Sequence, residues 1–220
     1  MKLNELRSKV RGTVVSPQES EYEVERRLYN SMIDKRPSLI VKCLGLQDVQ
    51  HALEYAETLG LKVSVRGGGH GVSGSALVEG GLVIDLSRMN GVWVDPKEKT
   101  AIVQGGVVWG EFDREAQVFG LANPGGKVST TGVAGFTLGS GIGWLSNKYG
   151  LACDNLLGAQ VVTVDGRVLN VDEDNERELF WAIRGGGHSM AVVTSFKFRL
   201  HRVGPMVCGG LLIYPERYFQ

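Results

Sequence analysis

Apolar positions near the start of the chain follow first strand, then helical, then strand spacing. Residues 39–44 form a short apolar run typical of a buried strand. Apolar side chains then recur at helical spacing from Leu46 to Leu59, and Gly60 follows as a helix-ending glycine. Residues 61–65 predict a second strand. The pattern therefore predicts a β-α-β unit that leads directly into a glycine-rich loop.

Upstream of this unit, residues 20–32 predict a short amphipathic helix that ends before Pro37. From Gly81 onward short β runs separated by turn residues predict a second, more antiparallel lobe. A hairpin is expected around an Asp165-Gly166 turn. The expected strands are 82–85, 91–94, 100–104, 156–163, 167–171 and 192–200, and the expected helices are 108–118 and 176–183.

Glycine is the most unusual feature of the composition, with 31 glycines against 6 prolines. The glycines concentrate in two dense stretches, 65–74 and 130–144, and in a third short segment at 185–187. Successive amides without Cβ atoms can form a concavity that binds anionic oxygens, above all phosphate. The stretches match neither a P-loop nor a clean dinucleotide fingerprint, so each alone fits a turn without ligand equally well. Together they favour a cofactor that carries a pyrophosphate.

Bulk properties exclude several classes of protein. The 220 residues are 43% hydrophobic and 22% charged, which is ordinary for a globular protein. Lys plus Arg and Asp plus Glu both number 24, so no net charge favours a nucleic acid or a membrane surface. No apolar segment resembles a secretory signal or a membrane span, and we expect a cytoplasmic protein. The three cysteines have no metal or disulfide spacing and are expected to be buried or inert.

His70 is the main candidate for chemistry, because it stands between Gly69 and Gly71 in the first glycine stretch. A neutral imidazole is a competent nucleophile, hydrogen-bond partner or metal ligand. A purely structural hydrogen-bonding histidine is the alternative. The four histidines include no His-x-x-x-His pair, so no metal site is expected.

A series of ordered motifs between Asn30 and Pro215 resembles the FAD-binding (PCMH-type) domain of the vanillyl-alcohol-oxidase superfamily, in its berberine-bridge-enzyme-like oxidase branch. The motifs lie at 30–37, 65–74, 82–87, 104–110, 124–126, 129–144, 148–151, 154–157 and 179–187. The resemblance implies an α+β fold of two lobes, a small β-α-β lobe and a larger, mostly antiparallel lobe, with FAD between them. It implies a helical lead-in at 1–36, an FAD-binding domain at 37–203 with lobes at about 37–90 and 91–203, and the start of a missing substrate domain at 204–220.

The resemblance also implies which residues hold FAD, with the pyrophosphate against residues 67–74 and the second glycine stretch along the rest of the cofactor. The expected FAD-binding residues are Arg66, Gly67, Gly68, Gly69, His70, Gly71, Val72, Ser73, Gly74, Pro124, Gly125, Thr130, Thr131, Gly132, Gly135, Gly139, Gly141, Gly143 and Val193. His70 is expected to bond covalently to the flavin 8α carbon. Val128 stands where some relatives carry a second, cysteine attachment, so a single attachment is expected.

The chain departs from the family pattern at residues 188–191, which read His-Ser-Met-Ala where relatives usually have Gly-Asn-Phe-Gly. His188 is interpreted as a tolerated substitution rather than a second attachment site. The larger departure is the substrate domain, which would carry the catalytic residues, so no catalytic residue is assigned. The apolar run at 207–214 is expected to leave an unpaired strand edge that can bind a partner chain or a second copy.

The resulting hypothesis is an FAD-dependent oxidoreductase domain whose flavin accepts a hydride from an alcohol, sugar or amine and is reoxidised by dioxygen. Two alternatives stay open: a non-catalytic FAD-binding half that needs a partner chain, and a degenerate domain without cofactor. The sequence specifies neither the substrate nor the electron acceptor.

Overall fold

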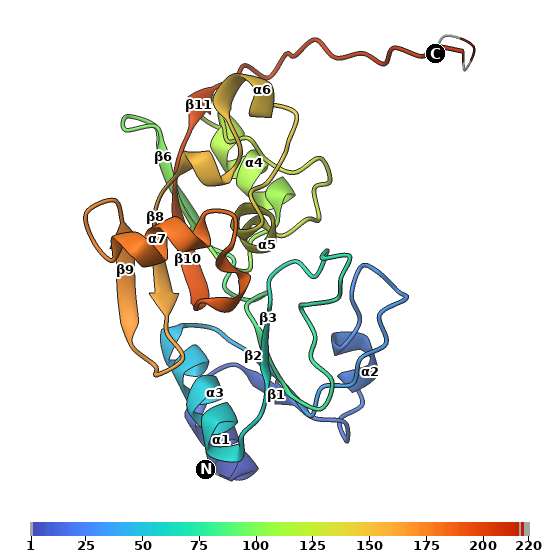
Figure 1. The fold of residues 1–220 in the computed structure, drawn as a ribbon, viewed down its shortest axis with the longest axis vertical. Helices are drawn as coiled ribbons and strands as arrows, with labels where there is room; N and C mark the ends of the chain where they lie inside the picture. The colour runs from blue at the N-terminus through green and yellow to red at the C-terminus, as the bar shows by residue number, and fades with distance from the viewer. Residues whose placement is uncertain (1, 216, 218–220) are drawn as a thin grey trace.

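The computed structural model describes residues 2–215 and residue 217, apart from the side chain of His188. Two sheets, one in each lobe, organise the chain (Figure 1). No helix in the described range is both long enough and apolar enough to cross a bilayer.

The first sheet has four strands in the order β1-β2-β4-β3. β2, β4 and β3 are parallel, and β1 adds an antiparallel edge. Its strands are β1 (Thr13–Val15), β2 (Leu39–Lys42), β3 (Val63–Arg66) and β4 (Leu82–Asp85). The sequence pattern predicts that 82–85 opens the second lobe. That is wrong, because β4 pairs with both β2 and β3 at the centre of the first sheet.

Both faces of this sheet are covered. Leu82 and Ile84 pack with helices α1 (Leu3–Lys9) and α3 (Leu46–Leu59), whereas Val83 faces a smaller cluster with Tyr22 on the other side. α3 ends as predicted at Gly60, whose φ of +63° is the left-handed conformation of a helix-ending glycine.

The second sheet is antiparallel throughout, in the order β5-β6-β10-β8-β9. Its strands are β5 (Val92–Asp95), β6 (Thr100–Gln104), β8 (Leu156–Val162), β9 (Val168–Asp172) and β10 (Val192–Arg199). The predicted hairpin is β8–β9, and its turn residue Gly166 has a φ of +79°. A small pair, β7 (Leu121–Ala122) with β11 (His201–Arg202), lies beside this sheet.

Short helices complete the second lobe around a core that includes Trp109, Phe112, Phe196 and Phe198. They are α4 (Trp109–Gln117), α5 (Val133–Leu138), α6 (Ser146–Tyr149), α7 (Arg177–Ile183) and the 3-10 turns η1 (Cys153–Asn155) and η2 (Gly187–Ser189).

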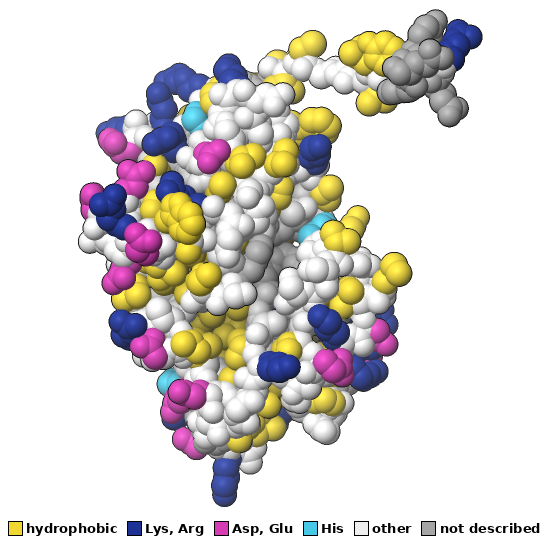
Figure 2. Space-filling model, viewed as in Figure 1, with side chains coloured by type: hydrophobic (Ala, Val, Ile, Leu, Met, Phe, Trp, Pro, Cys, Tyr) yellow, Lys and Arg dark blue, Asp and Glu magenta, His cyan; other side chains and the backbone are white. Residues whose placement is uncertain are grey.

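Two expected elements differ. The helix predicted over 20–32 is only α2 (Tyr22–Glu25), because the following residues leave the helix to contact the glycine loop: the Tyr29 amide donates to the Gly69 carbonyl at 3.2 Å. The apolar run at 207–214 forms no strand; it extends away from the second lobe with its side chains exposed (Figures 1 and 2).

The cysteines only partly follow expectation. Cys43 and Cys153 are buried free thiols, and burial raises the pKa of both. Cys208 is exposed on the extended C-terminal segment, so it is not buried, and its inertness stays a prediction.

Candidate functional site

The first glycine stretch leaves the sheet at the carboxyl end of β3, where Arg66 is in register with Asp85 at the end of β4. The amides of Gly68, Gly69, His70 and Gly71 donate no hydrogen bond to any described residue. Gly69 has a φ of +68°, which helps to curl the loop. A run of free amides in a curled backbone is the arrangement that binds phosphate oxygens.

At Gly68 this loop touches the second lobe backbone to backbone. A Cβ on Gly68 would overlap with the amide nitrogen and Cα of Gly132, and a Cβ on Gly132 would overlap with Gly68 in turn. Only glycine at both positions allows the contact without displacement of the backbone. The loop and the start of α5 therefore form two walls of one site, one wall from each lobe.

Beside this contact lies a cavity of about 360 Å³. One wall is the glycine loop with neighbouring residues of the first lobe, and the other comes from the second glycine stretch. The lining consists of Val65, Gly67, Gly68, Gly69, His70, Gly71, Val72, Ser73, Ser75, Ala76, Thr131, Gly132, Gly135 and Phe136.

His70 is held from two directions. Its Nε2 lies 2.9 Å from Oγ1 of Thr130 in the second lobe. Its ring stacks on Tyr29 of the first lobe, with centroids 4.0 Å apart and planes inclined by 16°. Partial burial lowers the pKa of His70 below 6.5, because desolvation disfavours the charged ring. Burial therefore favours the neutral imidazole, which is fixed at the edge of the cavity.

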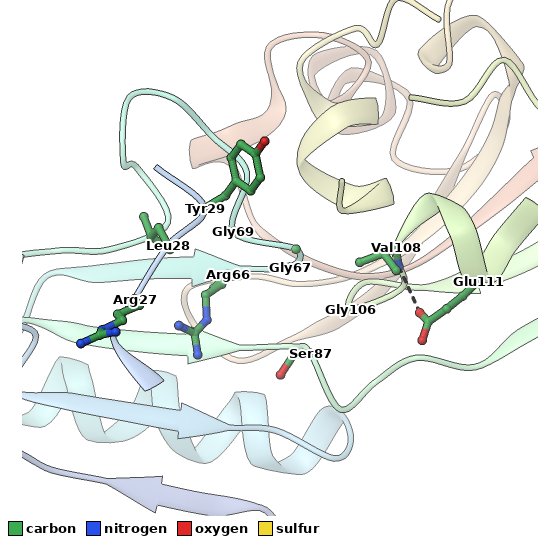
Figure 3. A pocket seen from close by; sticks show the side chains of 11 residues that line it. Arg27, Leu28, Tyr29, Arg66, Gly67, Gly69, Ser87, Gly106, Val108 and Glu111 are labelled. Atoms are coloured by element: carbon green, nitrogen blue, oxygen red, sulfur yellow. Dashed lines mark hydrogen bonds between the residues drawn. The ribbon is translucent and has the colours of Figure 1, made fainter. Parts of the chain in front are cut away.

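A second cavity of about 320 Å³ lies along the other side of the glycine loop (Figure 3). Tyr29 and Arg66 line it from the first lobe, and Val108 and Glu111 line it from the region of α4. The Glu111 carboxylate accepts a hydrogen bond from the Val108 amide at 3.2 Å, which caps α4 (Figure 3).

Arg66 is engaged by the protein itself. Its Nη2 lies 2.5 Å from Oδ2 of Asp85, which is fully buried, and its Nη1 donates to the Glu25 carbonyl oxygen. The pair joins the ends of β3 and β4 and fixes the point at which the glycine loop begins. Arg66, expected among the cofactor contacts, thus faces the second cavity and not the one that contains His70.

The structure brings together at the first cavity residues 67–73 with Thr131, Gly132 and Gly135, and Thr130 contacts this set through His70. The remaining predicted residues lie outside the linings of both cavities, and their contact with FAD stays a prediction. Of these, Gly74 packs on Ile33, Gly125 on Trp109, Gly143 on the Gly125 carbonyl and Gly141 between Phe136 and Ala152, while Gly139 caps α5 and Pro124 and Val193 are buried.

The third glycine segment differs from expectation. Gly187 packs against Ile183 and Leu138, and Gly185 faces Ser140, so this segment meets the far end of α5. It does not line the cavity at His70. The interpretation of His188 as a tolerated substitution concerns a side chain outside what the structure describes.

Several residues that line the two cavities were not predicted, and Tyr29, Phe136 and Glu111 are among them. Tyr29 stacks on His70, Phe136 lines the first cavity and Glu111 lines the second. Tyr29 directly precedes the 30–37 motif, and Glu111 directly follows the 104–110 motif, so both flank sequence that carries the family resemblance. Nothing in the periodicity places Tyr29 near His70 or Glu111 near the glycine loop, because the residues are far apart in the chain.

Comparison with known proteins gives one consistent result. A family profile described as an FAD binding domain matches residues 37–172. (R)-6-hydroxynicotine oxidase from Paenarthrobacter nicotinovorans is 38% identical over 205 residues, which is 93% of this chain and 45% of the relative. The chain thus spans less than half the length of this curated relative.

Solved structures agree with the sequence comparison. The crystal structure of 6-hydroxy-D-nicotine oxidase from Arthrobacter nicotinovorans matches with a TM-score of 0.86 and 40% identity, covering 88% of this chain and 43% of that one. Wild-type BBE-like 1 from Physcomitrella patens matches with a TM-score of 0.86 and 32% identity, covering 91% and 44%. Glucooligosaccharide oxidase from Acremonium strictum, which carries a 6-S-cysteinyl, 8α-N1-histidyl FAD, matches with a TM-score of 0.83 and 29% identity, covering 90% and 42%.

These matches confirm the α+β, PCMH-type fold expected from the sequence and identify FAD as the cofactor. The residues present fit that cofactor, because free amides and a cradle that a Cβ would close are what a pyrophosphate requires. The chain belongs to the FAD binding domain family, among the berberine-bridge-enzyme-like FAD-linked oxidoreductases.

Proposed function

We propose that this chain is the FAD-holding part of an oxidase that oxidises an alcohol, a sugar or an amine and returns the electrons to dioxygen. FAD, when bound, supplies the hydride acceptor. The observation that carries the proposal is the row of free amides from Gly68 to Gly71 opposite Gly132. These amides would hold the pyrophosphate, and residues 130–136 would form the opposite wall.

We further propose that His70 bonds covalently to the flavin. A neutral imidazole fixed at the cavity edge supports this, and so does the histidyl FAD of the Acremonium oxidase. The FAD of that oxidase also has a cysteinyl bond. This chain has Val128 in the segment where we expect such a cysteine, and Val128 has no nucleophilic atom. Attachment through His70 alone follows.

Substrate oxidation also needs a base for the substrate proton and a pocket over the flavin. Neither described cavity offers a base aimed at a substrate: Glu111 caps α4, and Arg66 is paired with Asp85. We therefore propose that those groups come from the rest of the protein or from a partner chain, and that this chain alone binds FAD but turns over substrate poorly.

The visible spectrum of the purified chain, taken before and after acid precipitation, tests both proposals. The wild type should be yellow and should leave its flavin in the pellet. His70→Ala should bind FAD but release all of it on precipitation. His51→Ala, which alters a histidine on α3 remote from the cavity, is the matched control and should behave as wild type. A colourless protein that binds no added FAD contradicts the proposed function, and an unchanged yellow pellet from His70→Ala contradicts the attachment site.

A further inference from the structure

The two nitrogens of the His70 ring are in different situations. Nε2 lies 2.9 Å from the Thr130 hydroxyl oxygen. Nδ1 has no hydrogen-bond partner within the part of the chain that the structure describes. A neutral imidazole carries a proton on one nitrogen and a free in-plane electron pair on the other. The partner at Nε2 therefore decides which nitrogen is nucleophilic.

Thr130 can act in either direction, since a hydroxyl both donates and accepts. If the hydroxyl oxygen accepts a hydrogen bond from Nε2–H, the free electron pair is on Nδ1. The ring must lose the Nε2 proton when Nδ1 forms a bond, and the same hydroxyl is then the acceptor beside that proton. If it donates to Nε2, Nδ1 keeps the proton and cannot attack. Only the first arrangement leaves His70 with a free nucleophilic atom.

Tyr29 fixes the plane of the ring. Its side chain stacks on His70 at 4.0 Å, and its own amide donates to the Gly69 carbonyl at 3.2 Å, one residue before His70. The next residue is also tied to the loop, because the Asn30 side-chain amide donates to the Val72 carbonyl at 3.1 Å. Tyr29 is thus part of a strap across the glycine loop and restricts rotation of the imidazole.

We propose that Thr130 and Tyr29 are positioning residues for covalent attachment: Thr130 selects the Nε2–H tautomer, and Tyr29 holds the ring so that Nδ1 meets the flavin 8α carbon. This inference rests on the proposed function. It assigns to two residues, one from each lobe, a role in making the bond.

The step balances with dioxygen as the oxidant. A bond forms between Nδ1 and the 8α carbon, while one C–H bond of the 8α methyl and the Nε2–H bond break. The two electrons released pass through the flavin to dioxygen, and with the two protons they give hydrogen peroxide. Thr130 is placed to accept the imidazole proton.

The test measures covalent FAD by intact mass after apoprotein is mixed with FAD in air. Thr130→Val keeps the shape of the side chain and removes the hydroxyl, whereas Thr130→Ser restores a hydroxyl. We expect Thr130→Val to attach FAD about 100-fold more slowly, the low end of what a positioned proton acceptor contributes, and Thr130→Ser to recover most of the rate. Tyr29→Leu should also be slow, and Tyr29→Phe, which keeps a flat ring, should match wild type.

Two further measurements separate positioning from loss of structure. Attachment rates are compared at saturating FAD, so that any loss of FAD binding in Thr130→Val, measured as the dissociation constant in the His70→Ala background where no bond can form, does not enter the rate. NMR of the flavin peptide should show Nδ1 linkage in wild type and a fraction of Nε2 linkage in Thr130→Val. Neither slower attachment at saturating FAD nor Nε2 linkage is expected if Thr130 only stabilises the fold.

The outcomes are distinct. Wild-type attachment rates in Thr130→Val overturn the role of Thr130, and wild-type rates in Tyr29→Leu overturn that of Tyr29. FAD binding without a covalent adduct in wild type overturns the whole inference but leaves FAD binding intact. Absence of FAD binding overturns the proposed function itself.

Discussion

At the scale of single residues, the site depends on glycines, which have no side chain. Gly68 and Gly132 come from different lobes and touch through their backbones. Gly135, on the first turn of α5, also lines the cavity, but a Cβ there would meet no protein atom within 4 Å. Gly68 and Gly132 are therefore needed for packing between the lobes in the apoprotein and Gly135 is not, although all three line the same cavity.

Gly68→Ala should destabilise the apoprotein by about 1–3 kcal/mol, the usual cost of forcing an extra carbon into a packed contact. Gly135→Ala should leave stability unchanged or raise it by up to about 1 kcal/mol, because alanine is the better helix former. Denaturant unfolding of both apoproteins checks this difference. Equal stability of the two variants would mean that the backbones at Gly68 and Gly132 are not in contact.

Residue-level prediction succeeded where the chemistry is local and stopped where it is not. His70 was singled out by its two glycine neighbours, and the structure fixes it at a cavity edge. Tyr29 lies 41 residues before His70 in the sequence, and Thr130 lies 60 residues after it. Their contacts with His70 arise only when strands β3 and β4 and the start of α5 are assembled.

At the scale of elements, α4 carries a feature that sequence reading overlooked. Asp113 lies within this helix, and burial raises its pKa to about 6. No hydrogen-bond partner for its carboxylate exists among the described residues, so the charged form is poorly solvated. Since the pKa in the unfolded chain is about 3.9, the folded state binds this proton more tightly.

The free energy of unfolding should therefore fall as pH rises from about 4 to 6, because the unfolded chain loses the Asp113 proton first. Asp113→Asn removes that fall. Its melting temperature should match wild type at pH 4 and exceed it at pH 7.5 by about 6–12 °C, the shift that roughly 3 kcal/mol, the linkage value of a pKa raised by about two units, produces in a chain of this size. Glu98→Gln, an exposed change on a turn, should show no such pH-dependent difference. An Asp113→Asn effect that is the same at both pH values would contradict a raised pKa.

Element prediction was reliable for α3, α4, β6 and the β8–β9 hairpin, where a strong local period is bounded by a glycine or a turn. It failed at residues 26–32. There Arg26 forms ion pairs with Glu23 and Asp34, and Tyr29 joins the glycine loop, so tertiary contacts replace the helical ones. The pattern of short β runs also placed β4 in the second lobe, in disagreement with the lobe boundary near residue 90 that the resemblance implies, because strand pairing between distant segments leaves no local signal.

At the scale of the whole molecule, the lobes share buried structure. Val162 and Val192 belong to strands of the second sheet but pack in the core cluster beneath the first. The Gln50 side chain on α3 donates to the Gly166 carbonyl in the β8–β9 turn at 2.7 Å. These contacts hold the lobes in one fixed relation, so the cavity between them exists before any ligand binds.

The extended C-terminal segment makes a separate prediction. Its apolar side chains are among the most exposed in the described chain, with Met206 at 90% and Leu212 at 83% (Figure 2). A chain ended at Val203, whose amide still bonds the Gly120 carbonyl, should keep its melting temperature within about 1 °C and should self-associate less. Sedimentation velocity checks the second point. Unchanged self-association of the shortened chain would mean that another surface mediates it. A lower melting temperature would show that this segment stabilises the fold.

The bare contact between Gly68 and Gly132 has one more consequence. Each lobe supplies one of the two walls that meet at Gly68 and Gly132. A chain cleaved in the turn before β5 would therefore give two fragments, neither of which binds FAD alone. The yellow colour of bound flavin would return only when the two fragments associate. Flavin absorbance would therefore report the association of the fragments.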